Sequence, residues 1–161
     1  MVDIEKLTKD TVNKGGVLVI LYFDLHDKDR EKLRQLATGF VDSMLKQDGV
    51  VTAYGEIEEP MEQNGAYSTT IETKILTKDF LSLLNLCSVF NPMAVEIQRP
   101  NDIRLSLDKA HDLLMSVAAN WFNIKKFITE RVSTKEEIET YRKYLENRAI
   151  LGKKMLEEKK G

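Results

Sequence analysis

The sequence has little cysteine, no long apolar run and no excess of charge of one sign. Cys87 is the single cysteine among 161 residues, which excludes an internal disulfide framework and a metal site built from several cysteines. No apolar run approaches the roughly 18 residues of a membrane-spanning helix, and the first residues do not resemble a signal peptide. We therefore expect no membrane partner and no export, and we expect a cytoplasmic location.

Charge is nearly balanced over the whole chain, with 24 basic and 26 acidic side chains. This balance gives no electrostatic reason to expect nucleic acid as the main partner. Residues 1–100 carry 11 basic and 16 acidic side chains, a net charge of −5, and residues 101–161 carry 13 and 10, a net charge of +3. The opposite signs fit two segments that pack together or pair between copies, although a solvent-exposed helix of mixed charge is the more ordinary explanation.

Recognisable catalytic and cofactor-binding motifs are also missing. The only glycine pair, Gly15-Gly16, precedes an apolar run with strand character, whereas a phosphate-binding glycine loop opens a helix. We therefore expect no cofactor and favour a non-enzymatic function. Hydrophobic residues make up 42% of the chain, which is enough for one full core.

The longest apolar run, Val17–Leu25, predicts a central strand because it is rich in β-branched and aromatic residues and is apolar on both faces at first. Alternation places Val17, Val19, Leu21, Phe23 and Leu25 on one face, and Leu18, Ile20, Tyr22, Asp24 and His26 on the other. The second face thus becomes polar where the strand ends.

Residues 1–14 predict a tail or short helix before a domain at residues 15–100. After the first strand, a helix capped by Asp27 or Asp29 runs to Leu45, and its Gly39 predicts close packing against the sheet. The elements expected next are a strand at Val50–Glu58, a hairpin with a long tip at residues 59–65, a strand at Tyr67–Leu76, a helix at Phe80–Phe90 and a strand at Met93–Arg99.

Residues 101–161 predict a helical extension that packs on the sheet or forms an oligomer interface. One apolar stripe extends from Leu107 to Val132, and the segment from Ser133 to Glu137 contains a capping-box pattern that restarts the helix. The last helix has a narrow apolar stripe near heptad spacing, which favours self-association as a homo-oligomer. The predicted interface residues are Trp121, Ile138, Tyr141, Leu145 and Leu156.

The strand and helix order over Val17–Arg99, βαββαβ, resembles the ferredoxin-like superfold, without indicating a specific family. The resemblance implies an α+β fold with a four-stranded antiparallel sheet, two helices on one face, and the first and third strands in the centre. The superfold hosts unrelated functions. Tyr67–Leu76 lacks the basic-Gly-aromatic pattern of RNA-recognition motifs, and the loop after His26 lacks the paired cysteines of heavy-metal-binding domains. ACT-type regulatory domains, which bind small molecules, remain compatible.

The end of the first strand is the best candidate site. Asp24 and His26 share a face, and a carboxylate beside an imidazole is the minimum for acid–base chemistry or for part of a divalent-metal site. Asp27 follows as a third possible metal ligand. The fold places neighbouring strands alongside, so the predicted ligand-binding residues are Tyr22, Asp24, His26, Tyr67 and Glu96. The ordinary alternative is a helix start, where aspartates cap the helix and a histidine lies at the rim.

Two functions follow from these patterns. The leading hypothesis is an interaction or regulatory module that self-associates. The alternative is an ACT-like sensor domain that binds a small molecule or a divalent metal ion at the end of the first strand.

Overall fold

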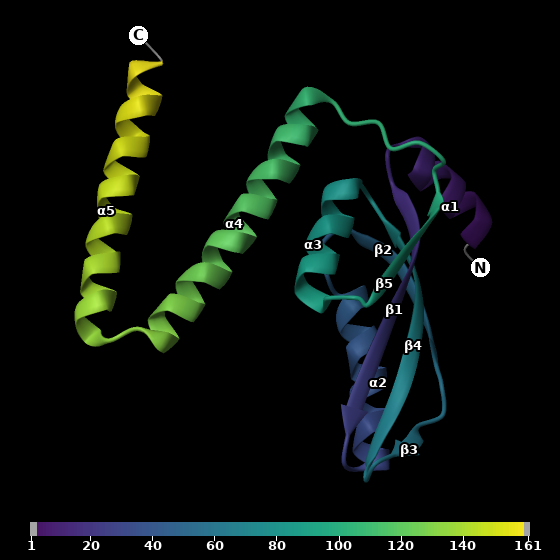
Figure 1. The fold of residues 1–161 in the computed structure, drawn as a ribbon. Coiled ribbons are helices and arrows are strands. Elements are labelled where there is room, and N and C mark those ends of the chain that lie inside the picture. The colour runs from purple at the N-terminus through teal and green to yellow at the C-terminus, as the bar shows by residue number, and fades with distance from the viewer. Residues whose placement is uncertain (1–2, 160–161) are drawn as a thin grey trace. The chain divides into compact units, whose positions relative to one another are not determined.

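A computed structural model describes residues 3–159 and confirms the α+β class (Figure 1). These residues form five helices and one antiparallel sheet of five strands. The chain divides into two compact units, residues 1–116 and residues 117–161. The helices are α1 (Ile4–Asn13), α2 (Arg30–Leu45), α3 (Phe80–Phe90), α4 (Leu107–Val132) and α5 (Lys135–Glu158). The strands are β1 (Val17–Asp27), β2 (Val50–Ile57), β3 (Met61–Gln63), β4 (Ala66–Thr77) and β5 (Ala94–Arg99).

The sheet has the strand order β2-β4-β1-β5, with β3 paired to the start of β4. β1 lies between β4 and β5, as its two apolar faces predict. The register of β1 with β4 runs without interruption from the pair Val17 and Thr77 to the pair Asp27 and Tyr67. This register decides which polar side chains lie beside the end of β1.

The connection between β2 and β4 differs from the sequence prediction of a long hairpin tip. Met61–Gln63 pairs with β4 as a fifth strand, and Asn64 and Gly65 alone make the turn. Their φ angles of 53° and 78° are those of a tight type I′ turn, for which Asn-Gly is a preferred sequence. The prediction of a four-stranded sheet was wrong at this point because a three-residue, exposed strand has too few residues to show a hydrophobic pattern.

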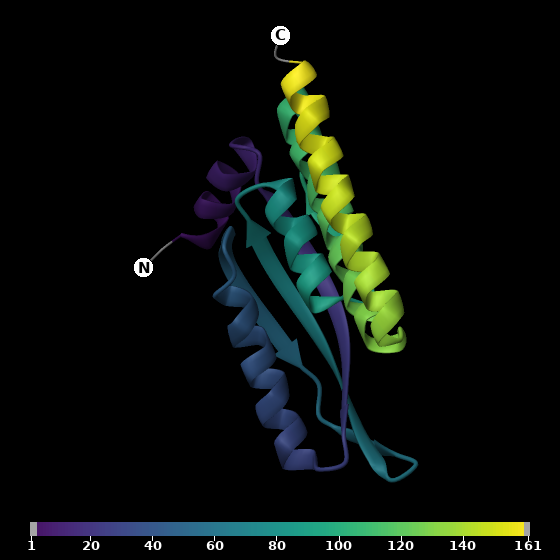
Figure 2. The same cartoon turned by 90° about the vertical axis from the view of Figure 1, so that its left-hand side faces the viewer.

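The main core lies between one face of the sheet and the helices α2 and α3, which cover the same face (Figure 2). Phe40 of α2 packs edge-on against Phe23 of β1 and Phe90 of α3, with ring centroids 4.9 and 5.3 Å apart. The apolar residues that alternate along β1 and those at helical spacing in α2 and α3 therefore pack into one cluster. Its buried members are Val17, Val19, Leu21, Phe23, Ala37, Met44, Ile71, Ile75, Leu83 and Leu86.

Helix α1 contacts β1 and β4 and covers one end of the opposite sheet face. Leu18 and Leu76 lie opposite each other in the register, are buried, and do not belong to the main core. Asp3 caps α1 by accepting a hydrogen bond from the amide of Lys6 at 3.1 Å, and Glu5 pairs with Arg99 of β5 at 2.7 Å. The N-terminal segment is therefore a capped helix that contributes to the fold.

Close packing between α2 and the sheet occurs at a different glycine from the one predicted. No atom lies within 4 Å of the position a Cβ would take on Gly39, so that prediction was wrong. A Cβ on Gly55 of β2 would instead lie 2.7 Å from a methyl group of Val41. A glycine within a helix, such as Gly39, is conspicuous in the sequence. The glycine that allows α2 to approach the sheet is Gly55, which lies in strand β2.

Helix α5 begins where the capping-box pattern predicts. The hydroxyl of Thr134 accepts a hydrogen bond from the Glu137 amide at 3.3 Å, and the Glu137 carboxylate accepts one from the Thr134 amide at 2.7 Å. Helix α4 continues without a break through Asn120 and Asn123. Neither of these described helices contains a buried residue.

Candidate functional site

The polar end of β1 carries a surface ion pair between the two residues predicted as its centre. His26 Nε2 lies 2.9 Å from Asp24 Oδ2, and the two side chains are 62% and 42% exposed. They share a face because strand residues two apart point to the same side of the sheet. An exposed pair of this kind contributes little to stability and stays hydrated.

Tyr22 and Glu96 also come together as predicted. The Tyr22 hydroxyl donates a hydrogen bond to Glu96 Oε2 at 3.3 Å, and the other carboxylate oxygen accepts one from Gln98 at 2.7 Å. Glu72 lies opposite Tyr22 in the register with β4. Partial desolvation of the phenol and the negative charges of Glu72 and Glu96 raise the pKa of Tyr22 above its ordinary value. The phenol therefore acts as a hydrogen-bond donor here.

Asp27 and Asp29 start helix α2, as the ordinary alternative for this segment predicts. Asp27 accepts a hydrogen bond from the Asp29 amide at 2.9 Å and pairs with the Lys32 ammonium at 3.1 Å. These contacts, the backbone hydrogen bond first, lower the pKa of Asp27. Asp29 is the N-cap and accepts a hydrogen bond from the Lys32 amide at 2.9 Å.

The structure divides the predicted ligand sets between the two faces of the sheet. Asp27 and Tyr67 lie opposite each other in the register, on the face that α2 covers, away from Asp24 and His26. Among residues 3–159, no three His, Cys, Asp or Glu side chains lie close enough together to hold a metal ion. The three predicted metal ligands therefore do not form one site, and Tyr67 does not join the other predicted ligand-binding residues.

Sequence reasoning missed several polar residues on the sheet face opposite α2 and α3. In the observed register, Glu56 lies opposite Glu72, and Tyr54 lies opposite Lys74. On the other side of β4, Glu72 lies opposite Tyr22 of β1, and Lys74 lies opposite Ile20. The alternation along β2 and β4 indicates which residues share this face. Only the strand register shows which of them are neighbours. This face offers carboxylates and phenols as hydrogen-bonding groups, and its one imidazole is paired with Asp24.

The comparison with protein families gives a match that covers most of the chain. A model of the MJ0538 family matches residues 18–158. The chain belongs to the MJ0538 family. No curated protein and no solved structure matches the chain. The family match extends from β1 to the end of α5, so it includes both the sheet and the two C-terminal helices.

The predicted interface residues of this MJ0538 family member fall into two groups. Ile138, Tyr141 and Leu145 are half-buried on α5, at helical spacing. Trp121 and Leu156 are 60% and 65% exposed. Within the second unit, the Arg148 guanidinium of α5 lies 5.4 Å from the centre of the Phe122 ring of α4, so the two helices contact each other there.

Helices α4 and α5 expose further apolar side chains that the predicted interface did not include. Arg131 lies over the Phe127 ring at 4.5 Å, yet that ring is still 56% exposed. In the described part of the chain, none of the helices combines the length and apolar character needed to cross a bilayer. The other exposed apolar residues of these helices within the second unit are Ile124, Ile128, Val132, Tyr144, Ile150, Leu151 and Met155.

Proposed function

We propose that this protein is a non-enzymatic interaction or regulatory module that self-associates through α4 and α5. One observation carries the proposal: these helices, 26 and 24 residues long, contain no buried residue and expose a large set of apolar side chains. Most helical stability in proteins comes from packing of an apolar face rather than from intrinsic propensity. A second copy of the helix pair supplies such a face.

The energetic argument concerns the exposed side chains of α4 and α5. Burial of one large apolar side chain contributes roughly 1.5–3 kcal/mol. Trp121, Ile128 and Leu151, each more than half exposed, thus offer a substantial gain on association. Two helix pairs from two copies can form a four-helix arrangement in which these side chains fill a common core.

We also propose that the first unit has a ferredoxin-like fold. The order β2-β4-β1-β5 with antiparallel neighbours supports this assignment, as does the position of α2 between β1 and β2 and of α3 between β4 and β5. In this description, β3 extends the hairpin, and α1, α4 and α5 are additions. The assignment gives a framework for binding and does not by itself imply an activity.

The non-enzymatic part of the proposal is supported by the exposure of the acid–base pair. Catalytic acid–base groups work in a pocket that limits water. Asp24 and His26 instead lie on an open sheet face with much of each side chain in solvent.

Sedimentation equilibrium of the full chain tests the proposal. We expect a dimer or larger species, and a monomer after the double substitution Trp121→Glu and Leu156→Glu. A matched control is Tyr54→Glu with Met61→Glu, since these residues of the sheet unit are equally exposed, at 65% and 60%. A monomeric wild-type chain at all concentrations, or a double variant with unchanged mass, would contradict self-association through these helices.

A small-molecule sensor is the second candidate. It is supported by the placement of Tyr22, Asp24, His26 and Glu96 on one sheet face. A thermal-shift screen of small organic molecules should then give a hit that His26→Ala removes. A hit that persists in the His26→Ala variant would exclude this site as its origin.

A further inference from the structure

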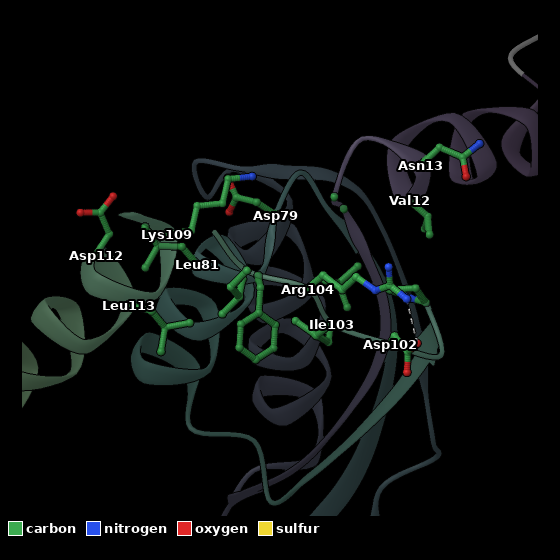
Figure 3. Close-up of a pocket in the computed structure, with 16 residues that line it drawn as sticks. Val12, Asn13, Asp79, Leu81, Asp102, Ile103, Arg104, Lys109, Asp112 and Leu113 are labelled. Carbon is green, nitrogen blue, oxygen red and sulfur yellow. Dashed lines mark ion pairs between the residues drawn. The ribbon is translucent and has the colours of Figure 1, made fainter. Parts of the chain in front are cut away.

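A cavity lies at the opposite end of β1 from the Asp24–His26 pair, within the first unit (Figure 3). Its volume is about 430 Å³, within the range of small-molecule sites. Five segments line it: the end of α1, the start of β1, the start of α3, the connection between β5 and α4, and the first turns of α4. The site hypotheses drawn from the sequence do not include it.

The walls of the cavity are largely apolar. Val17 is buried, and Phe80, Leu81 and Leu113 are half-buried, so the inner wall is held in place by the core. Ile103 and Leu105, in the connection that leads to α4, are 37% and 39% exposed. An apolar group in the cavity would cover this exposed surface, and such burial is favourable.

Two basic side chains, Arg104 and Lys109, also line the cavity. Arg104 pairs with Asp102 at 3.7 Å, and both side chains are largely in solvent. Lys109 has no ion-pair partner among residues 3–159, and its ammonium lies 3.8 Å from the position a Cβ would take on Gly15. The φ angle of +100° favours glycine at position 15, and the Lys109 ammonium lies beside this turn at the cavity.

Among residues 3–159, none of the acidic side chains that line the cavity forms an ion pair with Lys109. Asp79 caps α3, where one carboxylate oxygen accepts hydrogen bonds from the amide and hydroxyl of Ser82 at 2.8 and 2.7 Å. Asp102 pairs with Arg104. The Asp112 carboxylate points away from the other labelled side chains of the cavity in Figure 3. The Lys109 ammonium therefore remains available to pair with a ligand in the cavity.

We infer that the cavity binds a small organic anion with an apolar body, whose anionic group pairs with Lys109 and whose body lies against Phe80 and Leu113. A carboxylate attached to an aromatic ring or a short branched alkyl chain has this chemistry. A charged hydrogen bond to an ammonium fixes the anionic end, and the apolar walls supply most of the affinity. This inference is independent of self-association, because every lining residue belongs to the first unit.

Isothermal titration calorimetry of the full chain with 3-phenylpropionate and 4-methylpentanoate tests the inference. Saturable binding of at least one carboxylate is expected, and the alcohol and amine with the same apolar body should bind about tenfold more weakly or not at all. Lys109→Gln should weaken carboxylate binding about tenfold. Lys74→Gln, at an exposed lysine of the sheet in the same unit, should leave it unchanged.

A second variant, Leu113→Trp, fills the cavity and should abolish binding while far-UV circular dichroism stays as in the wild type. The inference is overturned if neither carboxylate binds saturably or if the alcohol or amine binds equally well. It is also overturned if carboxylate affinity is unchanged in folded Lys109→Gln or folded Leu113→Trp protein.

Discussion

The sheet unit has a buried apolar core of its own, whereas α4 and α5 contain no buried residue. Leu21 of β1 and Ile75 of β4 are completely buried, while Trp121 and Leu156 of the C-terminal helices are 60% and 65% exposed. Buried polar groups of the sheet unit are also satisfied, as where the Thr73 hydroxyl donates to the Leu21 carbonyl at 3.1 Å. The first unit thus has a core within itself, whereas the helix pair leaves an apolar surface exposed.

The largest difference between the regions should appear when a core residue is shortened. Leu21→Ala removes a fully buried side chain and leaves a cavity, so we expect a loss of about 3 kcal/mol in the free energy of unfolding of the sheet unit. Leu151→Ala, at an exposed position of α5, should change that free energy by less than about 0.5 kcal/mol. Denaturant unfolding followed by a probe of the sheet measures both. Equal losses of unfolding free energy in the two variants would contradict the difference between the two regions.

A smaller effect is expected at the start of α5. Thr134→Ala removes the side-chain half of the capping box, which should destabilise this helix by about 1 kcal/mol. Thr140→Ala is the matched control, because that threonine lies inside the helix and donates only to the Glu136 carbonyl. Helix content by far-UV circular dichroism should fall in the first variant alone. A loss of sheet stability in Thr134→Ala would show that the two regions are not independent.

The same cap makes α5 sensitive to acid. The backbone amide of Thr134, and then its hydroxyl, lower the pKa of Glu137 below its ordinary value of 4.5. A carboxylate with a lowered pKa in the folded state contributes stability above that ordinary value and loses it as the pH falls through the folded pKa. Helix content of α5 should therefore decline below about pH 4.5. In Glu137→Gln protein, amide exchange at the first turn of α5 should lose this pH dependence, and an unchanged dependence would contradict the assignment.

The smallest effect is expected at the exposed ion pair on β1. His26→Ala should change the free energy of unfolding by about 0.5 kcal/mol or less, because both partners are largely in solvent. Thermal unfolding of the wild type and the variant under the same conditions measures this contribution. A much larger loss would show that the pair has a structural or ligand-holding role that its exposure does not suggest.

Local patterns in the sequence predict local features of this fold. The alternation in Val17–Leu25 predicts both faces of β1, and the Thr134–Glu137 spacing predicts the start of α5, because each depends on residues close together in the chain. The strand β3 was missed because it has three exposed residues. The overall α+β class follows from the order of such segments.

Features that depend on distant segments were harder to predict. The position of Tyr67 beside Asp27 is set by the register of β1 with β4, which no local pattern contains. Likewise, Glu72 becomes a neighbour of Tyr22 only through that register. The cavity near Lys109 is formed by five separate segments, so no single stretch of sequence indicates it.

Amide hydrogen exchange of the full chain, compared before and after an approximately hundredfold dilution, tests most directly whether α5 depends on a partner. Amides of β1 and β4 should be equally protected at both concentrations, since the core of the sheet unit lies within one chain. Amides in the middle of α5 should be protected at high concentration and exchange faster after dilution. Protection of α5 that does not change over this dilution would contradict self-association through the helix pair.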